Sequence, residues 1–283
     1  MELTPRIAFF GTPELCIPVL ESLKEANMLP AVVVTQIDAP KGRGMIMTAP
    51  PVKVWAEENN IPVVQPEKLN EDFFQLYGTY DLDLAIVVAY GKIIPERVIN
   101  LPRYGSLNVH YSLLPKYRGA TPVEAALLAG DAETGVCIQQ MHFALDSGPV
   151  LAETHVMIED SERKPELLAR LNEIAAQMLP QIVEQVLTDT ATRREQDPME
   201  VTYSGKIEKA HGELRLTDDE HLENWRKFRA FYGNPGTFTF VEKDGKIVRL
   251  KITDAEFVDE KFVVKKVIPE GKKETDFENF LKS

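Results

Sequence analysis

The sequence predicts an α/β protein, in which a Rossmann-like, doubly wound sheet is followed by a smaller C-terminal domain that is β-barrel-like (OB-like). Two observations carry this prediction. Over the first part of the 283 residues, short apolar runs rich in β-branched residues alternate with helical patterns. The last part shows one helical pattern and then a series of short alternating strands. A chain of this length can bury one large core and a smaller one.

The first four expected strands are separated by helical patterns, an order typical of a parallel sheet covered by helices on both faces. They span residues 6–10, 31–35, 61–64 and 82–89. The first strand runs into Gly11-Thr12-Pro13-Glu14, which lacks the glycine spacing that lets a backbone approach a pyrophosphate. We therefore expect a Rossmann-like layout without a dinucleotide site.

The rest of the first domain is expected to add three strands and two helices. The strands are 106–110, 135–141 and 150–157; one helix begins at Thr121-Pro122 and the other covers 164–187. A polar stretch containing Pro198 then indicates a linker over the surface. The expected organisation is a larger domain over 1–189, a linker over 190–206 and a β-rich domain over 207–283.

The composition excludes several classes of protein. A formal net charge of −12 argues against a protein that coats nucleic acid non-specifically, because clustered lysine and arginine are needed to neutralise phosphates. The N-terminus has neither a basic leader nor an apolar run of signal length, and no run approaches the roughly 20 apolar residues of a membrane span. We expect a cytoplasmic protein that binds neither DNA nor a membrane.

Cysteine and histidine usage points away from disulfide and metal chemistry. Only Cys16 and Cys137 are present, without metal-like spacing, which favours a reducing compartment and two core thiols. The five histidines are scattered, and none forms a close ligand pair with a carboxylate or a cysteine. No metal is therefore expected.

The candidate active site lies where the strand 106–110 ends. Asn108 and His110 are two residues apart on that strand, so both side chains are expected on the same face. Asp146 lies in a turn between two expected strands, which could bring it beside His110. Acyl transfer to an amine needs an oxyanion donor, a base and a group that orients the base. Asn108, His110 and Asp146 match these roles in that order.

A carboxylate beside His110 is expected to favour the charged imidazole and so to raise its pKa. Asn108 and Asp146 could equally satisfy turn backbone while His110 packs in the interior. The spacing leaves both interpretations open. It also leaves open whether His110 or a water held by Asp146 takes the proton of the amine.

Longer motifs resemble the folate-dependent formyltransferases. The segment Asn108-Val109-His110, with Ser112-Leu113-Leu114-Pro115-Lys116-Tyr117-Arg118-Gly119 after it, is similar to the signature of that family. Further similar blocks follow the family's order along the chain: Phe10-Gly11-Thr12-Pro13-Glu14, Val34-Thr35-Gln36, Pro50-Pro51-Val52-Lys53, Gln65-Pro66-Glu67-Lys68-Leu69 and Val87-Val88-Ala89-Tyr90-Gly91. Near the C-terminus, Arg229-Ala230-Phe231 and Pro269-Glu270-Gly271-Lys272-Lys273 extend the resemblance to nearly the whole chain.

The resemblance implies a monomeric transferase of one-carbon metabolism that acts in translation initiation. Its donor would be 10-formyltetrahydrofolate and its acceptor the free amino group of methionyl-tRNA(fMet). Asn108, His110 and Asp146 occupy the positions that the family uses for catalysis. Two segments are implied to contact the folate, and their residues are Ser112, Leu113, Leu114 and Pro115, and Val87, Val88, Ala89 and Tyr90.

Contact with tRNA is implied for the domain 207–283 and for the glycine-rich loop after the second strand. Lys41 and Arg43 are the implied phosphate contacts in that loop, and the flanking glycines would allow it to move. Met45 and Ile46 stand where the resemblance leads us to expect further basic residues. Without the resemblance, the loop would be interpreted as a solvated turn with two surface cations.

Two alternative functions would use the same residues. A sugar-nucleotide N-formyltransferase with the same folate donor would share the Asn, His and Asp set, although the basic loop speaks against it. A non-catalytic folate- or tRNA-binding protein would use the three polar residues only to hold the loop together.

Overall fold

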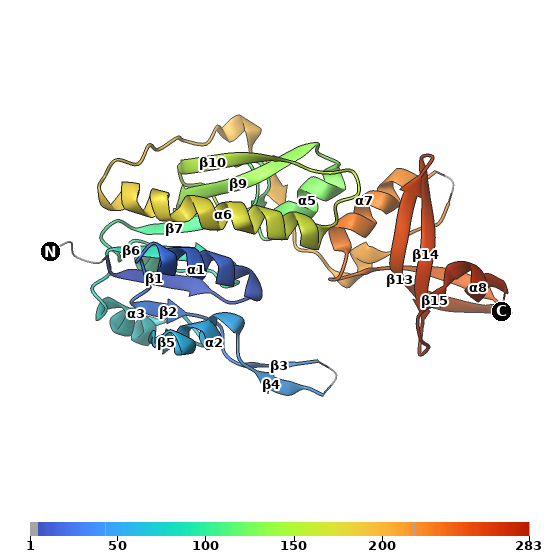
Figure 1. The fold of residues 1–283 in the computed structure, drawn as a ribbon, viewed down its shortest axis with the longest axis horizontal. Coiled ribbons are helices and arrows are strands. Elements are labelled where there is room, and N and C mark those ends of the chain that lie inside the picture. Colours follow the sequence, from blue (N-terminus) through green and yellow to red (C-terminus); the bar gives the residue numbers. More distant parts are fainter. Residues whose placement is uncertain (1–4, 43, 218, 283) are drawn as a thin grey trace. The chain divides into compact units, whose positions relative to one another are not determined.

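The structure is a computed structural model that describes residues 5–42, 44–217 and 219–282. It divides into two compact units, which are described separately (Figure 1). Unit 1 comprises Met1–Arg118, Gly135–Val156 and Ala169–Thr202, and unit 2 comprises Gly119–Thr134, Met157–Leu168 and Tyr203–Ser283. The domain boundaries expected at 189 and 206 stay a prediction, but neither unit is a single stretch of chain.

Unit 1 is built on a seven-stranded sheet. In spatial order its strands are β10 (Val150–Met157), β9 (Glu133–Gln140), β7 (Ser106–His110), β6 (Leu84–Val88), β1 (Ile7–Gly11), β2 (Val32–Val34) and β5 (Val63–Val64). The strands from β7 to β5 pair in parallel, whereas β9 runs antiparallel to β7. The predicted fold class is confirmed, and the sheet is mixed at one edge, where β9 and β10 lie.

Helices cover both faces of this sheet, and the burial of its central strands shows why. Every residue of β1 and β6 is buried, as in strands that are covered on both sides. Phe10 of β1 packs with Phe73 and Tyr77 in one apolar cluster. In Figure 1, α1 and α6 lie over the face of the sheet nearer the viewer. The helices are α1 (Ile17–Glu25), α2 (Pro51–Glu58), α3 (Glu71–Gly78), α4 (Glu96–Ile99) and most of α6 (Lys164–Leu187).

The segment after β2 forms a hairpin where the sequence predicts an irregular loop. Its strands, β3 (Ala39–Lys41) and β4 (Ile46–Thr48), pair antiparallel. All three residues of β3 are exposed, so no alternation of apolar and polar residues marks the strand in the sequence. By contrast, β7 and α6 have the predicted bounds, because each carries a clear apolar periodicity.

Unit 2 contains a separate antiparallel sheet, as the sequence predicts for the C-terminal part. Its order is β12 (Thr237–Lys243), β13 (Lys246–Val258), β14 (Lys261–Pro269) and β15 (Thr275–Asp276). Helix α7 (His221–Phe231) packs Trp225 and Phe228 into an apolar cluster with Phe262. Further elements are α8 (Phe277–Lys282) and the short paired strands β8 (Arg118–Gly119) and β11 (Tyr203–Ser204).

Two segments that the sequence assigns to the first domain pack within unit 2. Helix α5 (Pro122–Ala129) contacts α7. Arg229 of α7 donates from Nη1 to the carbonyl oxygen of Glu159 at 3.1 Å, and Trp225 donates from Nε1 to that of Asp160 at 3.2 Å. These contacts satisfy backbone carbonyls of residues 158–163, the irregular connection between β10 and α6.

Candidate active site

The end of β7 and the turn between β9 and β10 bring together the three predicted catalytic side chains. Asn108 and His110 lie on β7, where Asn108 is paired with Gln139 of β9. Asn108 Nδ2 lies 3.4 Å from Asp146 Oδ1, and His110 Nδ1 lies 3.7 Å from Asp146 Oδ2. His110 is 5% exposed. An amide, an imidazole and a carboxylate therefore meet in a largely buried place.

His110 is oriented by a backbone carbonyl. Its Nε2 lies 3.0 Å from the carbonyl oxygen of Tyr117. A carbonyl can only accept a hydrogen bond, so Nε2 carries the proton and the neutral ring has its lone pair on Nδ1, which faces Asp146. The 3.7 Å between Nδ1 and Asp146 is longer than a normal hydrogen bond. Tyr117, which the sequence places in the family signature without a role, thus selects the tautomer in place of Asp146.

Burial lowers the pKa of His110 below its ordinary value of 6.5, because the buried site penalises the charged ring. The charge of Asp146 and the carbonyl of Tyr117 both act in the opposite direction. The expectation of a raised pKa is therefore wrong, because the loss of solvation outweighs the neighbouring carboxylate. His110 is neutral near neutrality, and a proton added at Nδ1 would face Asp146.

Asp146 is held in an unusual turn conformation by two glutamines. Its φ is +45°, a left-handed conformation that costs a residue other than glycine about 1 kcal/mol or more. Gln139, which is buried, donates from Nε2 to Asp146 Oδ1 at 3.0 Å. Gln196 donates to the backbone carbonyl of Asp146 at 2.9 Å. Sequence reasoning missed both residues. A glutamine inside the apolar run of β9 was a usable signal, whereas Gln196 lies in a stretch without periodicity.

Most residues predicted to contact folate lie in the interior. Only Ala89 is exposed and only Leu113 is half-buried; the buried ones are Val87, Val88, Tyr90, Ser112, Leu114 and Pro115. Ser112 Oγ donates to the carbonyl oxygen of Lys116 at 2.6 Å, and Leu114 packs with Cys137 and Val150. Around Ala89 the chain turns through positive φ values, +46° at Ala89 and +81° at Gly91. Contact of these segments with folate stays a prediction.

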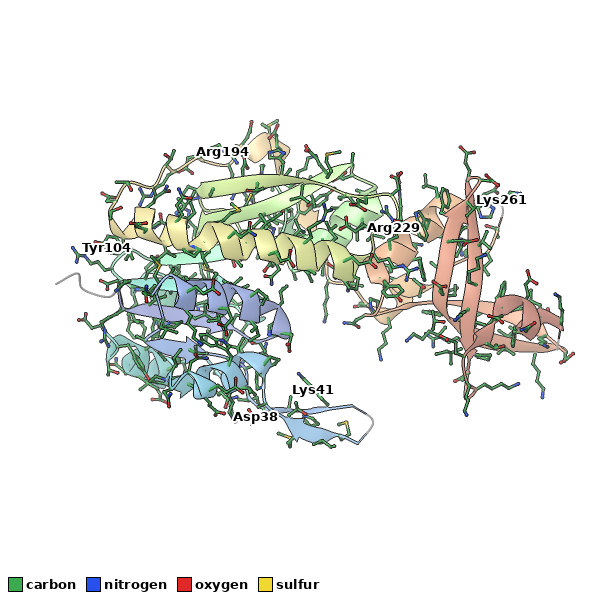
Figure 2. The ribbon with its side chains drawn as sticks, in the orientation of Figure 1. Asp38, Lys41, Tyr104, Arg194, Arg229 and Lys261 are labelled. Atoms are coloured by element: carbon green, nitrogen blue, oxygen red, sulfur yellow. The ribbon has the colours of Figure 1, made fainter. Side chains whose placement is uncertain are left out.

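Of the two predicted phosphate contacts, only Lys41 lies in the part of the chain that the structure describes. Lys41 ends β3 and is exposed, whereas Arg43 lies outside the described residues. Figure 2 shows Lys41 on the hairpin and Asp38 at its base. Asp38 accepts a hydrogen bond from Gln65 Nε2 at 2.8 Å and pairs with Lys53 Nζ at 2.9 Å. The hairpin base is thus fixed, and its tip presents Met45, Ile46 and Met47 to solvent.

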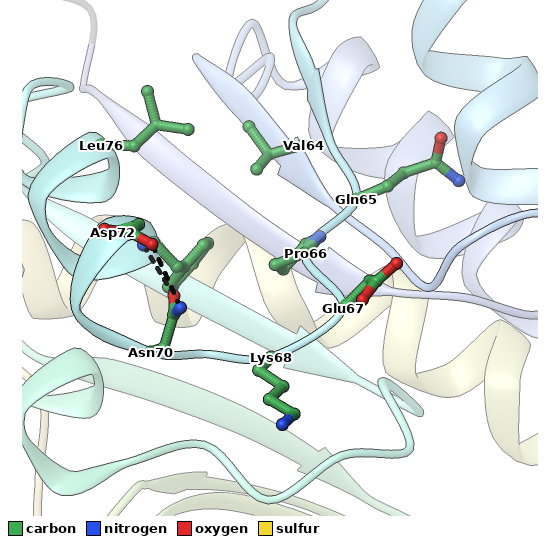
Figure 3. Close-up of a pocket in the computed structure, with 9 residues that line it drawn as sticks. Val64, Gln65, Pro66, Glu67, Lys68, Asn70, Asp72 and Leu76 are labelled. Carbon is green, nitrogen blue, oxygen red and sulfur yellow. Dashed lines mark hydrogen bonds between the residues drawn. The ribbon is translucent and has the colours of Figure 1, made fainter.

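A separate pocket of about 420 Å³ opens beside β5 (Figure 3). Its lining residues are Val64, Gln65, Pro66, Glu67, Lys68, Asn70, Asp72, Phe73 and Leu76. None of the three predicted catalytic residues is among them. The Asn70 side chain caps α3 by accepting from the Phe73 amide at 3.2 Å, so this polar group is already used structurally.

Metal binding and thiol chemistry find no support in the described part of the chain. No group of three His, Cys, Asp or Glu that could hold a metal occurs among the described residues. Both cysteines are buried, and burial raises the pKa of Cys16 and of Cys137 to about 12, so both remain thiols near neutrality. Within the described residues, no helix combines the length and apolarity that a membrane crossing needs.

Comparison with known proteins identifies the family. Residues 5–183 match the family model described as formyl transferase. A methionyl-tRNA formyltransferase of Neisseria gonorrhoeae is 39% identical over 249 residues, which are 87% of this chain and 80% of that protein. One of Halorhodospira halophila is 41% identical over 235 residues, 83% and 75% of the two chains. The crystal structure of a sugar N-formyltransferase from a Shewanella species shares the fold, with a TM-score of 0.67, 16% identity and coverage of 90% of this chain and 100% of that one. The chain belongs to the methionyl-tRNA formyltransferase family.

Proposed function

We propose that this chain transfers a formyl group from 10-formyltetrahydrofolate to the free amino group of methionyl-tRNA(fMet), and that Asn108, His110 and Asp146 carry the reaction. The observation that supports these roles best is the meeting of an amide, a neutral imidazole and a carboxylate at the end of β7. Each group has a different task in acyl transfer to an amine.

His110 acts as the base through Nδ1. Its Nε2 proton is engaged by the Tyr117 carbonyl, so Nδ1 is the nitrogen that can accept the proton lost by the attacking amine. Asp146 faces the imidazolium that then forms, at 3.7 Å, and its charge favours that state. This arrangement favours direct proton transfer to His110 over transfer to a water held by Asp146.

Asn108 stabilises the negative charge that develops on the formyl oxygen. Its Nδ2 donates to Asp146 at 3.4 Å, a long contact that can be exchanged for a stronger hydrogen bond to an oxyanion. The donor, when bound, supplies an electrophilic formyl carbon; when the tetrahedral intermediate collapses, the bond from that carbon to the carrier nitrogen would break, and the proton held by His110 would go to that nitrogen, so that tetrahydrofolate leaves. Its carrier would meet Ala89, Leu113 and the backbone between Ala89 and Gly91, because the other predicted contacts are buried.

The β3–β4 hairpin and the residues 207–283 are the proposed tRNA contacts. Lys41 offers a cation for a phosphate, and the exposed apolar tip offers surface that could pack against an unpaired end of the acceptor stem. We also propose that the chain is a monomer and works in the cytoplasm; light scattering at working concentration would test its oligomeric state.

The decisive test is formyl transfer by the purified chain from 10-formyltetrahydrofolate, with two acceptors in parallel. One is methionyl initiator tRNA and the other is an amino-sugar nucleotide; a His110→Gln variant measures background. We expect formylmethionyl-tRNA to form only with His110 present. Transfer to the sugar alone would support a sugar-nucleotide N-formyltransferase. Binding of folate or tRNA without transfer to either would support a non-catalytic binding protein.

A further inference from the structure

A strap formed by residues 194–202 ties together the two loops that hold His110 and Asp146. The sequence suggests a surface linker here, and the strap contains only one short 3-10 turn, at Pro198–Glu200. Gln196 is nevertheless 8% exposed. The strap begins at Arg194, which exchanges two backbone hydrogen bonds of 2.9 Å with Val150 of β10. It is therefore anchored to the sheet of unit 1.

Gln196 connects the strap to the turn that carries Asp146. Its Nε2 donates to the carbonyl oxygens of Asp146, at 2.9 Å, and of Gly148, at 2.7 Å. Its Oε1 accepts from Nε and Nη2 of Arg118, at 3.0 and 2.8 Å. A side-chain amide has two donor hydrogens and two acceptor positions, and Gln196 uses all four.

The strap also fixes the loop that orients His110. Thr202 accepts from the amide of Tyr117 through Oγ1, at 2.8 Å, and from the amide of Arg118 through its carbonyl oxygen, at 2.9 Å. Tyr117 has a φ of +59°, and its carbonyl accepts the His110 Nε2 proton. Asp146 and Tyr117 are thus both in left-handed conformations, and contacts with one strap hold both.

We propose that Gln196 is a positioning residue of the formyl-transfer site: by joining Arg118 to the carbonyls of Asp146 and Gly148, it sets the separation between His110 and Asp146. This inference rests on the proposed function for its kinetic consequence. The physical reason is that a displacement of about 1 Å in a catalytic group can reduce a rate on the order of 100-fold. Gln196 itself is required to touch neither donor nor acceptor.

Two substitutions distinguish the hydrogen bonds that Gln196 accepts from Arg118 from those that it donates to the Asp146 turn. Gln196→Met keeps the length of the side chain and removes all four hydrogen bonds. Gln196→Glu keeps oxygen acceptors for Arg118 and removes the donors to the turn. The matched control is Ser106→Ala, which removes a buried hydrogen bond of 2.7 Å to Ile99 at the other end of β7. If either Gln196 variant fails to fold, Thr202→Val tests the same strap through a single lost acceptor.

The kinetic test compares kcat with the KM for each substrate. We expect both Gln196 variants to lower kcat by about 10- to 100-fold with both KM values within about threefold, while Ser106→Ala leaves all three constants unchanged. An unchanged kcat in Gln196→Met, or an equal loss in Ser106→Ala, would overturn the inference. If kcat falls in Gln196→Met but is unchanged in Gln196→Glu, the hydrogen bonds from Gln196 to the Asp146 turn do not contribute to positioning.

A second readout is independent of activity. The ring signals of His110, assigned by their loss in His110→Gln, report its environment by NMR. We expect these signals and their titration midpoint to shift in Gln196→Met and to stay in place in Ser106→Ala. If the shift occurs but the wild type does not formylate methionyl-tRNA, the proposed function fails while the strap keeps its assignment. If the wild type transfers formyl groups but the His110 signals do not shift in Gln196→Met, the strap does not position His110.

Discussion

The end of β7 and the β3–β4 hairpin differ in how their side chains are held. At β7, His110 is 5% exposed, and its ring and Asp146 are fixed by Tyr117, Gln139 and Gln196. On the hairpin, all of β3 is exposed, and Asp38 at its base is held by Gln65 and Lys53. A reacting group gains from a fixed position, whereas a surface that meets a large flexible partner can adjust on contact. Substitutions in the two regions should therefore affect different kinetic constants.

The largest expected effect is that of His110→Ala. Removing the base should lower kcat by about 1,000-fold, within the range of general acid–base catalysis, with little change in the KM for methionyl-tRNA. Single-turnover formylation at saturating enzyme measures it. The folded control is Ser106→Ala on the same strand. Turnover within about threefold of wild type would remove His110 from the chemistry.

Asp146→Asn comes next. The amide keeps the shape of the side chain but removes the charge that favours the imidazolium, so kcat should fall by about 100-fold while folate affinity stays within about threefold. Folate binding by calorimetry and turnover by formylation assay give the two values. Parallel losses in both would show that Asp146 contributes to ground-state binding instead.

Lys41→Glu should weaken the binding of methionyl-tRNA and leave folate binding and turnover unchanged. We expect the KM for methionyl-tRNA to rise by about tenfold, the salt dependence of tRNA binding to fall by about one unit of slope, and kcat and folate affinity to remain unchanged. Titrations at several salt concentrations measure the slope, and Lys68→Glu, away from the hairpin, serves as the charge-matched control. An equal effect of both variants would mean that only net charge matters.

The smallest expected effect concerns the titration of His110. Burial disfavours the charged ring, so its NMR midpoint should lie below 6.5, with the neutral base present above that midpoint and lost as the pH falls through it. Because Asp146 opposes this shift, Asp146→Asn should lower the midpoint further. A rise in that variant would contradict the account of the two opposing influences.

The sequence predicts elements with strong periodicity and side chains that share a strand. It therefore gives the bounds of β7 and α6 and the common face of Asn108 and His110. It misses β3 and β4, since exposed strands carry no apolar alternation. It also predicts the wrong direction for the His110 pKa, because burial depends on the packing of distant segments, which no local pattern reports.

Contacts that depend on backbone groups were equally hidden from the sequence. Tyr117 acts on His110 through its carbonyl, and Gln196 meets Asp146 fifty residues away through another. Any residue type provides a carbonyl, so residue identity gives no hint of such partners. The sequence also assigns α5 and the 157–168 segment to the first domain, because contacts between segments far apart in the chain leave no local pattern; in the structure both belong to unit 2 with the C-terminal residues.

The strap at 194–202 also affects how the chain could change its length over evolution. Irregular segments usually tolerate inserted or deleted residues. Here Arg194 bonds to β10, Gln196 to the turn that carries Asp146, and Thr202 to the Tyr117 loop, all within nine residues of chain. Insertion or deletion of one residue between them would break at least one of these contacts. Length changes should therefore be rare in this unpatterned stretch and more frequent at the tip of the β3–β4 hairpin.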